Sequence, residues 1–187
     1  MHSFISKLVS PIRDFVFGKK QKAVTPIKTL GESGVKLSHF LSPEAIIINN
    51  AIKDKEEAIR MLSEHLCRLH NIESAETVSD EIIKRERLES TFLDNEVAIP
   101  HARYQGVKKI TSVLGIFPQG IKENETEKLP AKFIFLFLSP VDALTQHLQL
   151  LTRIAFVFQD NLVKSSLLKI KDPADIYYLI KEKEGIA

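Results

Sequence analysis

The sequence has little of what disulfide, metal or nucleotide sites are built from. Its 187 residues include a single cysteine, Cys67, which excludes an intrachain disulfide framework and a cysteine metal cluster. It contains neither a GxxxxGK[ST] loop nor a GxGxxG turn, so a nucleotide-binding motif is missing. Without an HExxH pair or a nucleophile-elbow serine, zinc and serine hydrolase chemistry also lack a basis in the sequence.

Long apolar runs are missing as well. No stretch reaches the roughly 18 apolar residues of a transmembrane helix, so we expect none. Charges interrupt the apolar residues near the N-terminus, so we expect no secretory signal. With one cysteine, this favours a reducing cytoplasm. A composition of 44% hydrophobic and 27% charged residues is typical of a globular protein with one main domain.

The net charge of +2 hides an uneven distribution. Residues 1–36 carry seven Lys/Arg and two acids, whereas residues 37–187 carry nineteen Lys/Arg and twenty-two acids. We therefore predict a basic N-terminal extension and linker, residues 1–36, followed by a mildly acidic domain, residues 37–187. Apolar residues of the extension recur at helical spacing, so it either contacts a membrane surface or partner, or packs on its own domain. This charge balance gives no reason to expect nucleic-acid binding.

Beyond the extension, short apolar runs alternate with helical patterns. We expect strands over residues 46–48, 97–99, 110–117 and 133–138, the last buried on both faces. We expect helices over about 16 residues after Asp54, then over residues 74–88, 142–158, 161–169 and 173–182. Polar loops are expected at 90–96 and 122–128, and a turn at 118–120. Central strands flanked by helices predict an α/β sandwich.

Two of the six histidines are candidates for chemistry. His101 follows Pro100 at the end of an apolar run, and Arg103 lies two residues further on. Because proline removes a backbone donor, we expect His101 at a strand end rather than in mid-strand, where it could accept an anionic or phosphoryl group. His147 lies about one turn into a helix that follows the most apolar strand. One hypothesis is that the two histidines converge in a crevice at the strand ends; the alternative is that His147 makes a core hydrogen bond.

Several segments together resemble a known family. They are Arg85-Glu86, Ser90-Thr91, the run Val97-Ala98-Ile99-Pro100-His101-Ala102, and residues 133–140, 147–155 and 172–180. In order and spacing they resemble type-2 IIA domains of the phosphoenolpyruvate-dependent sugar phosphotransferase system, the fructose, mannitol and nitrogen-regulatory class. The resemblance covers about residues 37–182. It implies the IIA fold, an α/β fold with a mixed central sheet sandwiched by helices.

The resemblance also implies roles for single residues. His101 matches the phosphorylated histidine of the family, His147 matches its second active-site histidine, and Arg85 matches an arginine that meets the phosphoryl group. Thr91 matches a threonine of the active-site loop, and Arg103 is a supporting charge. The implied phosphoryl donor is a phosphohistidine on HPr or on an NPr-like nitrogen-branch carrier. Because histidines carry the phosphoryl group on both sides of the transfer, the implied chemistry needs no cofactor and no metal.

One segment departs from the family pattern. Relatives usually carry glycines in the loop before the Ala-Ile-Pro-His run, whereas residues 91–96 of this chain contain none. Asn95 or Asp94 is expected to take any position with positive φ. Asp94 and Glu96 are also expected to place negative charge near the phosphoryl group, which bears on transfer rate and carrier preference.

Three functions fit these observations. The first is a regulatory module of the nitrogen type, whose phosphorylation state switches its target protein. The second is a IIA component of fructose or mannitol uptake that passes the phosphoryl group from His101 to a IIB domain. The third is a binding module that is never phosphorylated, which the glycine-poor loop keeps open. Since the chain has no IIB or IIC sequence attached, we expect the regulatory function.

Overall fold

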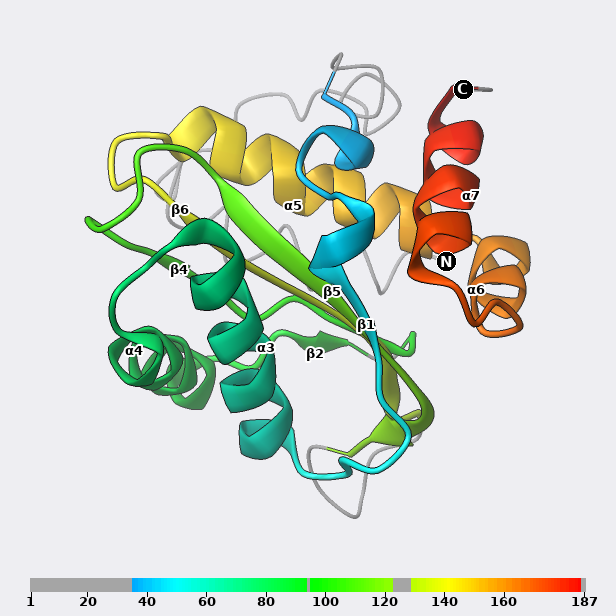
Figure 1. Cartoon of the computed structure of the whole chain (residues 1–187), viewed down its shortest axis with the longest axis horizontal. Coiled ribbons are helices and arrows are strands. Elements are labelled where there is room, and N and C mark those ends of the chain that lie inside the picture. Colours follow the sequence, from blue (N-terminus) through cyan, green and yellow to red (C-terminus); the bar gives the residue numbers. More distant parts are fainter. Residues whose placement is uncertain (1–34, 94, 123–128, 186–187) are drawn as a thin grey trace, which may run out of the picture.

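A mixed β-sheet forms the centre of the molecule (Figure 1). The structure, a computed structural model, describes residues 35–93, 95–122 and 129–185. Most of the predicted extension and of the predicted loop at 122–128 therefore lies outside the described residues. The strands are β1 (Ile46–Ile48), β2 (Phe92–Leu93), β3 (Val97–Ala98), β4 (His101–Arg103), β5 (Thr111–Ile121) and β6 (Ala131–Ser139). Their order is β1-β5-β6-β3-β2, and β4 also pairs with β6.

Strand β6 is the centre of this sheet. It runs antiparallel to β5 on one side and parallel to β3 and β4 on the other. Strand β1 is parallel to β5, and β2 is antiparallel to β3. The unbroken apolar residues 133–138 are all fully buried, which confirms the prediction of a strand covered on both faces.

Helices cover both faces of the sheet, which confirms the predicted α/β sandwich. Two short 3-10 helices, η1 (Leu37–His39) and η2 (Pro43–Ala45), precede β1. The longer helices are α3 (Lys55–His70), α4 (Ala75–Leu88), α5 (Leu144–Phe158), α6 (Asn161–Leu167) and α7 (Pro173–Gly185). Helices α3 and α4 lie on one side of the sheet, and α5, α6 and α7 on the other (Figure 1).

Helix α3 has the boundaries that its end residues predict. The Asp54 side chain accepts a hydrogen bond from the Glu57 N–H at 2.9 Å, which satisfies a free donor of the first turn. Asn71 ends the helix in the left-handed conformation, with φ 55°. Gly115 of β5 lets the helix lie close to the sheet, because a Cβ at Gly115 would stand 2.9 Å from a Leu62 methyl group.

Two local predictions are wrong. Residues 118–120 do not turn the chain, because β5 continues through them to Ile121 with an irregular register between Ile116 and Ile121. Gly120 takes φ 77° there, and a Cβ at this position would stand 2.7 Å from the Pro130 ring. Helix α5 begins at Leu144 rather than at Asp142, and Ala143, which precedes it, makes no side-chain cap.

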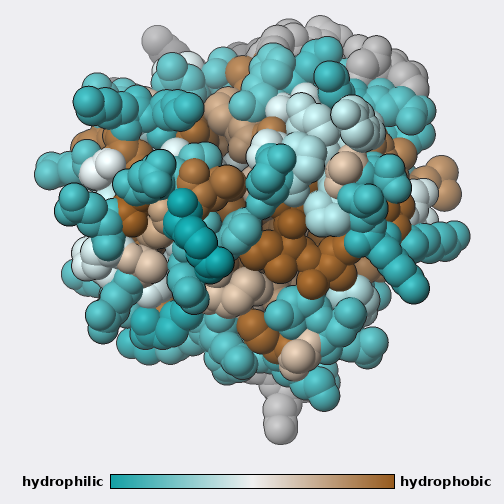
Figure 2. All heavy atoms as spheres, in the orientation of Figure 1, coloured by the Kyte–Doolittle hydropathy of each residue, from teal (hydrophilic) through white to brown (hydrophobic). Residues whose placement is uncertain are grey.

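The surface drawn in Figure 2 is largely hydrophilic. Apolar side chains reach it near the middle of this face, over β1 and between α3 and α7 (Figure 2). Ile47 and Ile48 of β1 are only partly buried there. Within the described residues, every helix is too short or too polar to cross a bilayer.

Candidate functional site

His101 reaches the site because the strand that carries it is broken. Strands β3 and β4 lie end to end along β6, with Ile99 and Pro100 between them. The Pro100 carbonyl still accepts a hydrogen bond from Phe137 N–H at 3.2 Å, so the chain stays against β6 across the break. The prediction for His101 is therefore only partly right: it starts strand β4 and is buried, with 8% of its surface exposed.

A backbone carbonyl fixes the proton of the His101 ring. Nδ1 lies 2.7 Å from the carbonyl oxygen of Ile99. Since a carbonyl oxygen can only accept, Nδ1 of the neutral ring carries the hydrogen. Nε2 is then left with a free electron pair, which is the form that a nucleophile needs.

His147 and His101 converge, as one of the two hypotheses predicts. Their ring centroids are 5.0 Å apart at an interplanar angle of 68°. The Phe137 ring stacks on His101 at 5.2 Å and contacts His147 at 5.1 Å. His147 Nδ1 also lies 2.7 Å from Oγ of Ser139, the last residue of β6. The alternative, a satisfied hydrogen bond in the core, thus holds together with the convergence.

Both rings are uncharged at neutral pH. The pKa of His101 is lowered from 6.5 to about 3, mainly by burial and to a smaller extent by His147 and Arg85, against the hydrogen bond to Ile99, which raises it. Burial also lowers the pKa of His147 to about 4, with smaller contributions from Arg103 and Arg85. The site therefore holds two neutral imidazoles side by side.

Two arginines supply positive charge beside these rings. Arg85, half-buried near the end of α4, donates a hydrogen bond to the Glu89 carbonyl at 2.6 Å. Arg103 is exposed on β4, and its charge acts on His147. Among the described residues, neither arginine forms an ion pair with a carboxylate. An anion at the histidine pair would therefore find positive charge that no ion pair within the described part of the chain neutralises.

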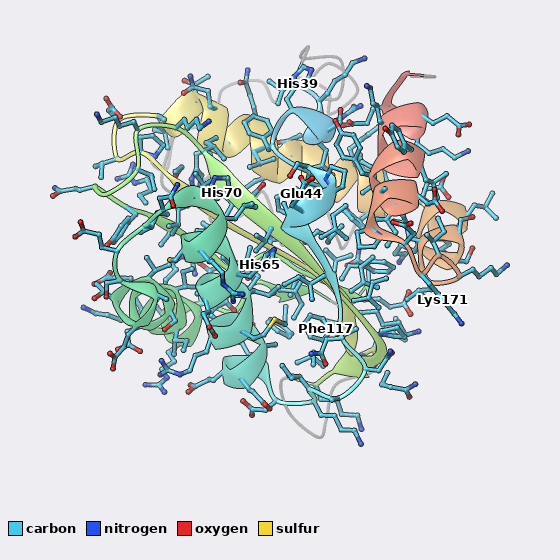
Figure 3. All side chains as sticks on the ribbon, viewed as in Figure 1. His39, Glu44, His65, His70, Phe117 and Lys171 are labelled. Atoms are coloured by element: carbon cyan, nitrogen blue, oxygen red, sulfur yellow. The ribbon has the colours of Figure 1, made fainter. Side chains whose placement is uncertain are left out.

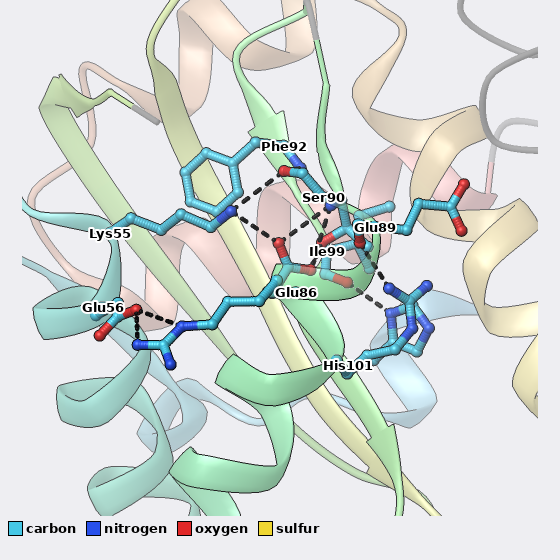
Figure 4. A network of polar contacts seen from close by, with 11 residues as sticks. Lys55, Glu56, Glu86, Glu89, Ser90, Phe92, Ile99 and His101 are labelled. Carbon is cyan, nitrogen blue, oxygen red and sulfur yellow. Dashed lines mark hydrogen bonds and ion pairs between the residues drawn. The ribbon is translucent and has the colours of Figure 1, made fainter. Parts of the chain in front are cut away.

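Thr91 lies in the site but its hydrogen-bond donors are directed elsewhere. Its N–H lies 3.2 and 3.1 Å from the two carboxylate oxygens of Glu86, and its hydroxyl donates to the same carboxylate. Lys55 of α3 forms an ion pair with Glu86 at 3.2 Å and bonds to Ser90 Oγ (Figure 4). We call Lys55, Glu86, Ser90 and Thr91 the Glu86 cluster. It holds the loop beside His101, and Thr91 does not point a donor at the rings.

Glu86 belongs to the Arg85-Glu86 segment that resembles the family, but the resemblance implies no role for it. Its signal is visible on the helix: Val78, Ile82 and residue 86 follow at intervals of four, so position 86 lies on the buried face. Only 3% of Glu86 is exposed. A charged residue at a position where the helical pattern predicts an apolar one indicates a partner in the interior. Ser139 had no comparable signal.

The glycine-free loop differs from the prediction. It is not a plain loop, because β2 pairs with β3 in antiparallel fashion. Positive φ falls on Glu96, at 70°, rather than on Asn95, while Asp94 lies outside the described residues. Glu96 forms ion pairs with Lys132 at 2.7 Å and Lys164 at 3.5 Å. Its charge is therefore compensated, at the end of β3 remote from His101, and does not face the histidines.

Three further histidines, His39, His65 and His70, are labelled in Figure 3. His39 is exposed on η1, and His65 Nε2 lies 2.6 Å from the Glu44 carbonyl. Burial lowers the pKa of His70 near the end of α3. His2 lies outside the described residues. Within the described part of the chain, no three His, Cys, Asp or Glu side chains gather so as to hold a metal ion.

Comparison with known proteins gives a family match over most of the chain. The sequence model of the family described as "Phosphoenolpyruvate-dependent sugar phosphotransferase system, EIIA 2" matches residues 39–183. The histidine pair, Arg85 and the Glu86 cluster all lie inside this range.

Individual relatives agree with the family match. A nitrogen regulatory protein of Bradyrhizobium diazoefficiens is 26% identical over 144 residues, which cover 77% of this chain and 94% of the relative. The 2-O-alpha-mannosyl-D-glycerate-specific EIIABC component of Escherichia coli is 26% identical over 153 residues, 81% of this chain but only 23% of that protein. Among solved structures, the nitrogen regulatory protein IIA-Ntr of Neisseria meningitidis superposes with a TM-score of 0.69 at 25% identity, covering 76% of this chain and 97% of that one.

Proposed function

Since the chain belongs to the EIIA type 2 family of the phosphoenolpyruvate-dependent sugar phosphotransferase system, we propose that it accepts a phosphoryl group on Nε2 of His101. The observation that carries this proposal is the pair of buried, neutral imidazoles beside two arginines that form no ion pair with a carboxylate of the described residues. The donor is a phosphohistidine on an HPr-type or NPr-like carrier protein. The reaction needs no cofactor and no metal.

The transfer exchanges one nitrogen–phosphorus bond for another. The electron pair of His101 Nε2 attacks phosphorus, and the bond from phosphorus to the donor imidazole breaks with its electrons returning to the donor nitrogen. Nδ1 keeps its hydrogen, which the Ile99 carbonyl holds throughout. Because His101 is already neutral, no proton has to leave it before the attack.

Charge stabilisation falls to Arg85 and His147, with Arg103 in support. The transition state of phosphoryl transfer is loose, and its negative charge is spread over the three equatorial oxygens. Positioned positive charge and N–H donors stabilise such a state. When the Ser139 hydroxyl donates to His147 Nδ1, His147 Nε2 carries a hydrogen that it can donate to a phosphoryl oxygen.

We assign the chain to the regulatory branch of the family. The nitrogen regulatory relative and the solved IIA-Ntr protein match this chain over 94% and 97% of their own lengths, which supports this assignment. In this role, the phosphorylation state of His101 switches the binding of a regulatory target protein. The EIIABC relative supports the second candidate, a sugar-uptake IIA component that passes the phosphoryl group to a IIB domain.

Phosphorylation in a reconstituted system tests the acceptor. The protein is incubated with phosphoenolpyruvate, enzyme I and HPr or the nitrogen-branch carrier, and the bound phosphate is assayed for acid lability and base stability. We expect wild type and His39→Ala, a matched change of an exposed histidine, to be labelled, and His101→Ala to remain unlabelled. Equal labelling of His101→Ala contradicts the assignment. A wild type that no carrier labels contradicts phosphoryl transfer and supports the unphosphorylated binding module.

The same labelled protein separates the regulatory role from the transport role. It is mixed with the IIB part of the mannosylglycerate EIIABC relative and of a fructose-specific EIIABC component. A regulator is expected to keep its phosphoryl group much longer than a transport IIA component, which would pass it to the IIB part within one turnover. Rapid passage of the label to either IIB part contradicts the regulatory assignment and supports sugar uptake.

A further inference from the structure

We propose that Glu86 is a positioning residue for His101, which it orients through the backbone of Thr91 and Ile99. The inference rests on the proposed function only in naming His101 as the acceptor. Glu86 does not touch the histidine ring. It acts by holding the residues that hold the ring, and Figure 4 shows Glu86, Ile99 and His101 within this network of polar contacts.

The Glu86 carboxylate is buried and makes several polar contacts at once. It lies on the buried face of α4, where it accepts from the N–H and the hydroxyl of Thr91. The ammonium group of Lys55 lies 3.2 Å from the same carboxylate. Buried carboxylates are tolerated when they are paired and hydrogen-bonded, and these contacts meet both conditions. Thr91 is thereby fixed relative to helices α3 and α4.

The next contacts lead from Thr91 to the reacting ring. The Thr91 carbonyl accepts a hydrogen bond from the Ile99 N–H at 3.3 Å. The carbonyl of Ile99, on the same residue, accepts from His101 Nδ1 at 2.7 Å. The orientation of the Ile99 residue therefore depends on Thr91, and the hydrogen on His101 depends on Ile99. Glu86 thus fixes which ring nitrogen remains free to attack.

Lys55 holds the same segment from its other side. Its ammonium group is 3.2 Å from Ser90 Oγ and 4.5 Å from the centroid of the Phe92 ring. Ser90 Oγ in turn accepts from the Phe92 N–H at 3.2 Å. Residues 90–92 are therefore held between two helices by a carboxylate and an ammonium group. This arrangement suits a loop that has to stay in place beside a reacting group without glycine in it.

The geometry also separates Glu86 from its neighbour in sequence. Arg85 acts on both histidines by its charge, whereas Glu86 points into the protein, away from solvent. A negative charge facing the histidines would oppose an incoming phosphoryl group. Directed at Thr91 and Lys55 instead, the Glu86 charge is compensated while its hydrogen bonds order the site.

The test is the tautomer of His101, read from long-range proton–nitrogen NMR spectra of the imidazole at neutral pH. In the wild-type protein we expect the form with hydrogen on Nδ1 alone. In Glu86→Gln we expect a mixture with the Nε2–H form, together with phosphorylation about tenfold slower, because bonds to a charged group are lost. The tautomer is measured without any phosphoryl donor. The tautomer therefore tests the role of Glu86 even if the wild-type protein is never phosphorylated. That result would overturn the proposed function and not this inference.

Matched variants separate positioning from general loss of stability. Glu56→Gln removes the same charge from another ion pair between α3 and α4, that with Arg87, which is exposed and outside the Glu86 cluster. We expect it to match the wild type in both measurements. Thr91→Val keeps the backbone and removes one donor, so it should shift the tautomer in the same direction, and Thr91→Ser should restore it. Thr91→Val keeps the test possible if Glu86→Gln does not fold.

Two results overturn the proposal. One is a folded Glu86→Gln or Thr91→Val protein in which His101 keeps the Nδ1–H form alone. The other is a tautomer shift of equal size in Glu56→Gln, because the effect would then follow from weakening the α3–α4 pair and not from the contacts of Glu86.

Discussion

The two ends of the paired strands β3–β4 and β6 carry opposite electrostatic arrangements. At the histidine end, around His101 and His147, two arginines stand beside neutral rings, and no described carboxylate forms an ion pair with them. At the lysine end, where β3 and β6 begin, Glu96 lies between Lys132 and Lys164. Among the described residues, each end has two cations, and a carboxylate lies between them at the lysine end and not at the histidine end.

This difference supports the proposal that the histidine end binds the phosphoryl group. A compensated charge holds segments together and gives an incoming anion little to bind. At the histidine end the positive charge of the arginines is not paired with a described carboxylate, and the histidine rings beside it are uncharged. Such a site attracts an anion. Changes at the histidine end should therefore alter phosphoryl transfer, and changes at the lysine end should alter stability.

The largest effect is expected for Arg85→Ala. It removes positive charge from the place where negative charge develops, so phosphorylation should slow about 100-fold. The free energy of unfolding should change little, because Arg85 is half-buried and, among the described residues, its side chain makes one hydrogen bond, to the Glu89 carbonyl. Arg87→Ala, an exposed arginine of the same helix, is the control and should be labelled at the wild-type rate. Equal loss in both variants would mean that Arg85 acts through the helix.

At the lysine end, Lys164→Met should have the opposite result. The Lys164 ammonium group is buried, donates to the Asn95 carbonyl at 2.7 Å and pairs with Glu96. Its loss should lower the free energy of unfolding by about 2 kcal/mol, measured by urea denaturation. Phosphorylation of the folded variant should stay within about twofold of wild type. A much slower transfer would show that the two ends are coupled and would break the comparison.

The two ends should lose their contributions to the free energy of unfolding at different pH values. The pKa values of His101 and His147 are lower in the folded protein than the usual 6.5, so their contribution to stability is complete above 6.5 and is lost as pH falls toward 4 and 3. Between pH 7 and pH 5, each histidine should lower the free energy of unfolding by about 2 kcal/mol. His101→Gln should flatten this part of the curve in urea titrations between pH 7 and 5. An unchanged slope would contradict the burial of a neutral ring.

Glu96 should lose its contribution only at lower pH. Partial burial raises its pKa, but the hydrogen bond and charge of Lys132 and the charge of Lys164 outweigh this and place the pKa below 4.5. Its contribution is therefore present above 4.5 and disappears as pH falls below that value. Glu96→Gln should leave the curve between pH 7 and 5 unchanged.

The smallest effect is expected for Lys132→Met. Its ion pair with Glu96 is partly exposed, so water screens it, and the free energy of unfolding should fall by less than about 1 kcal/mol. Comparison with Lys164→Met under the same conditions tests whether burial decides the size of the effect at this end. A larger loss for Lys132→Met than for Lys164→Met would reverse the order.

Much of this architecture could be predicted from local patterns. Residues 133–138 are uniformly apolar, and Asp54 and Asn71 mark the ends of α3, so neighbours in sequence were sufficient there. The passage of β5 through residues 118–120 was not predictable in this way, because pairing with β6 and the approach of Pro130 decide it. The same holds for β2, whose partner is β3.

The site divides along the same line. His101 and His147 were predictable because proline and helix position mark them. The Ile99 carbonyl that fixes the His101 ring is a backbone group and has no sequence signal. The role of Ser139 became visible only once the end of β6 was placed beside His147 of α5. The prediction that Glu96 places negative charge near the histidines was wrong. Glu96 forms ion pairs with two lysines, far apart in sequence, at the other end of the strands.

The most direct test of the central claim is the position of the phosphoryl group. Protein labelled with nitrogen-15 is phosphorylated through enzyme I and the carrier, and phosphorus–nitrogen couplings are read from NMR spectra of the histidine rings. We predict a coupling to Nε2 of His101, with the hydrogen still on Nδ1. A phosphoryl group on Nδ1 of His101, or on His147, would contradict it.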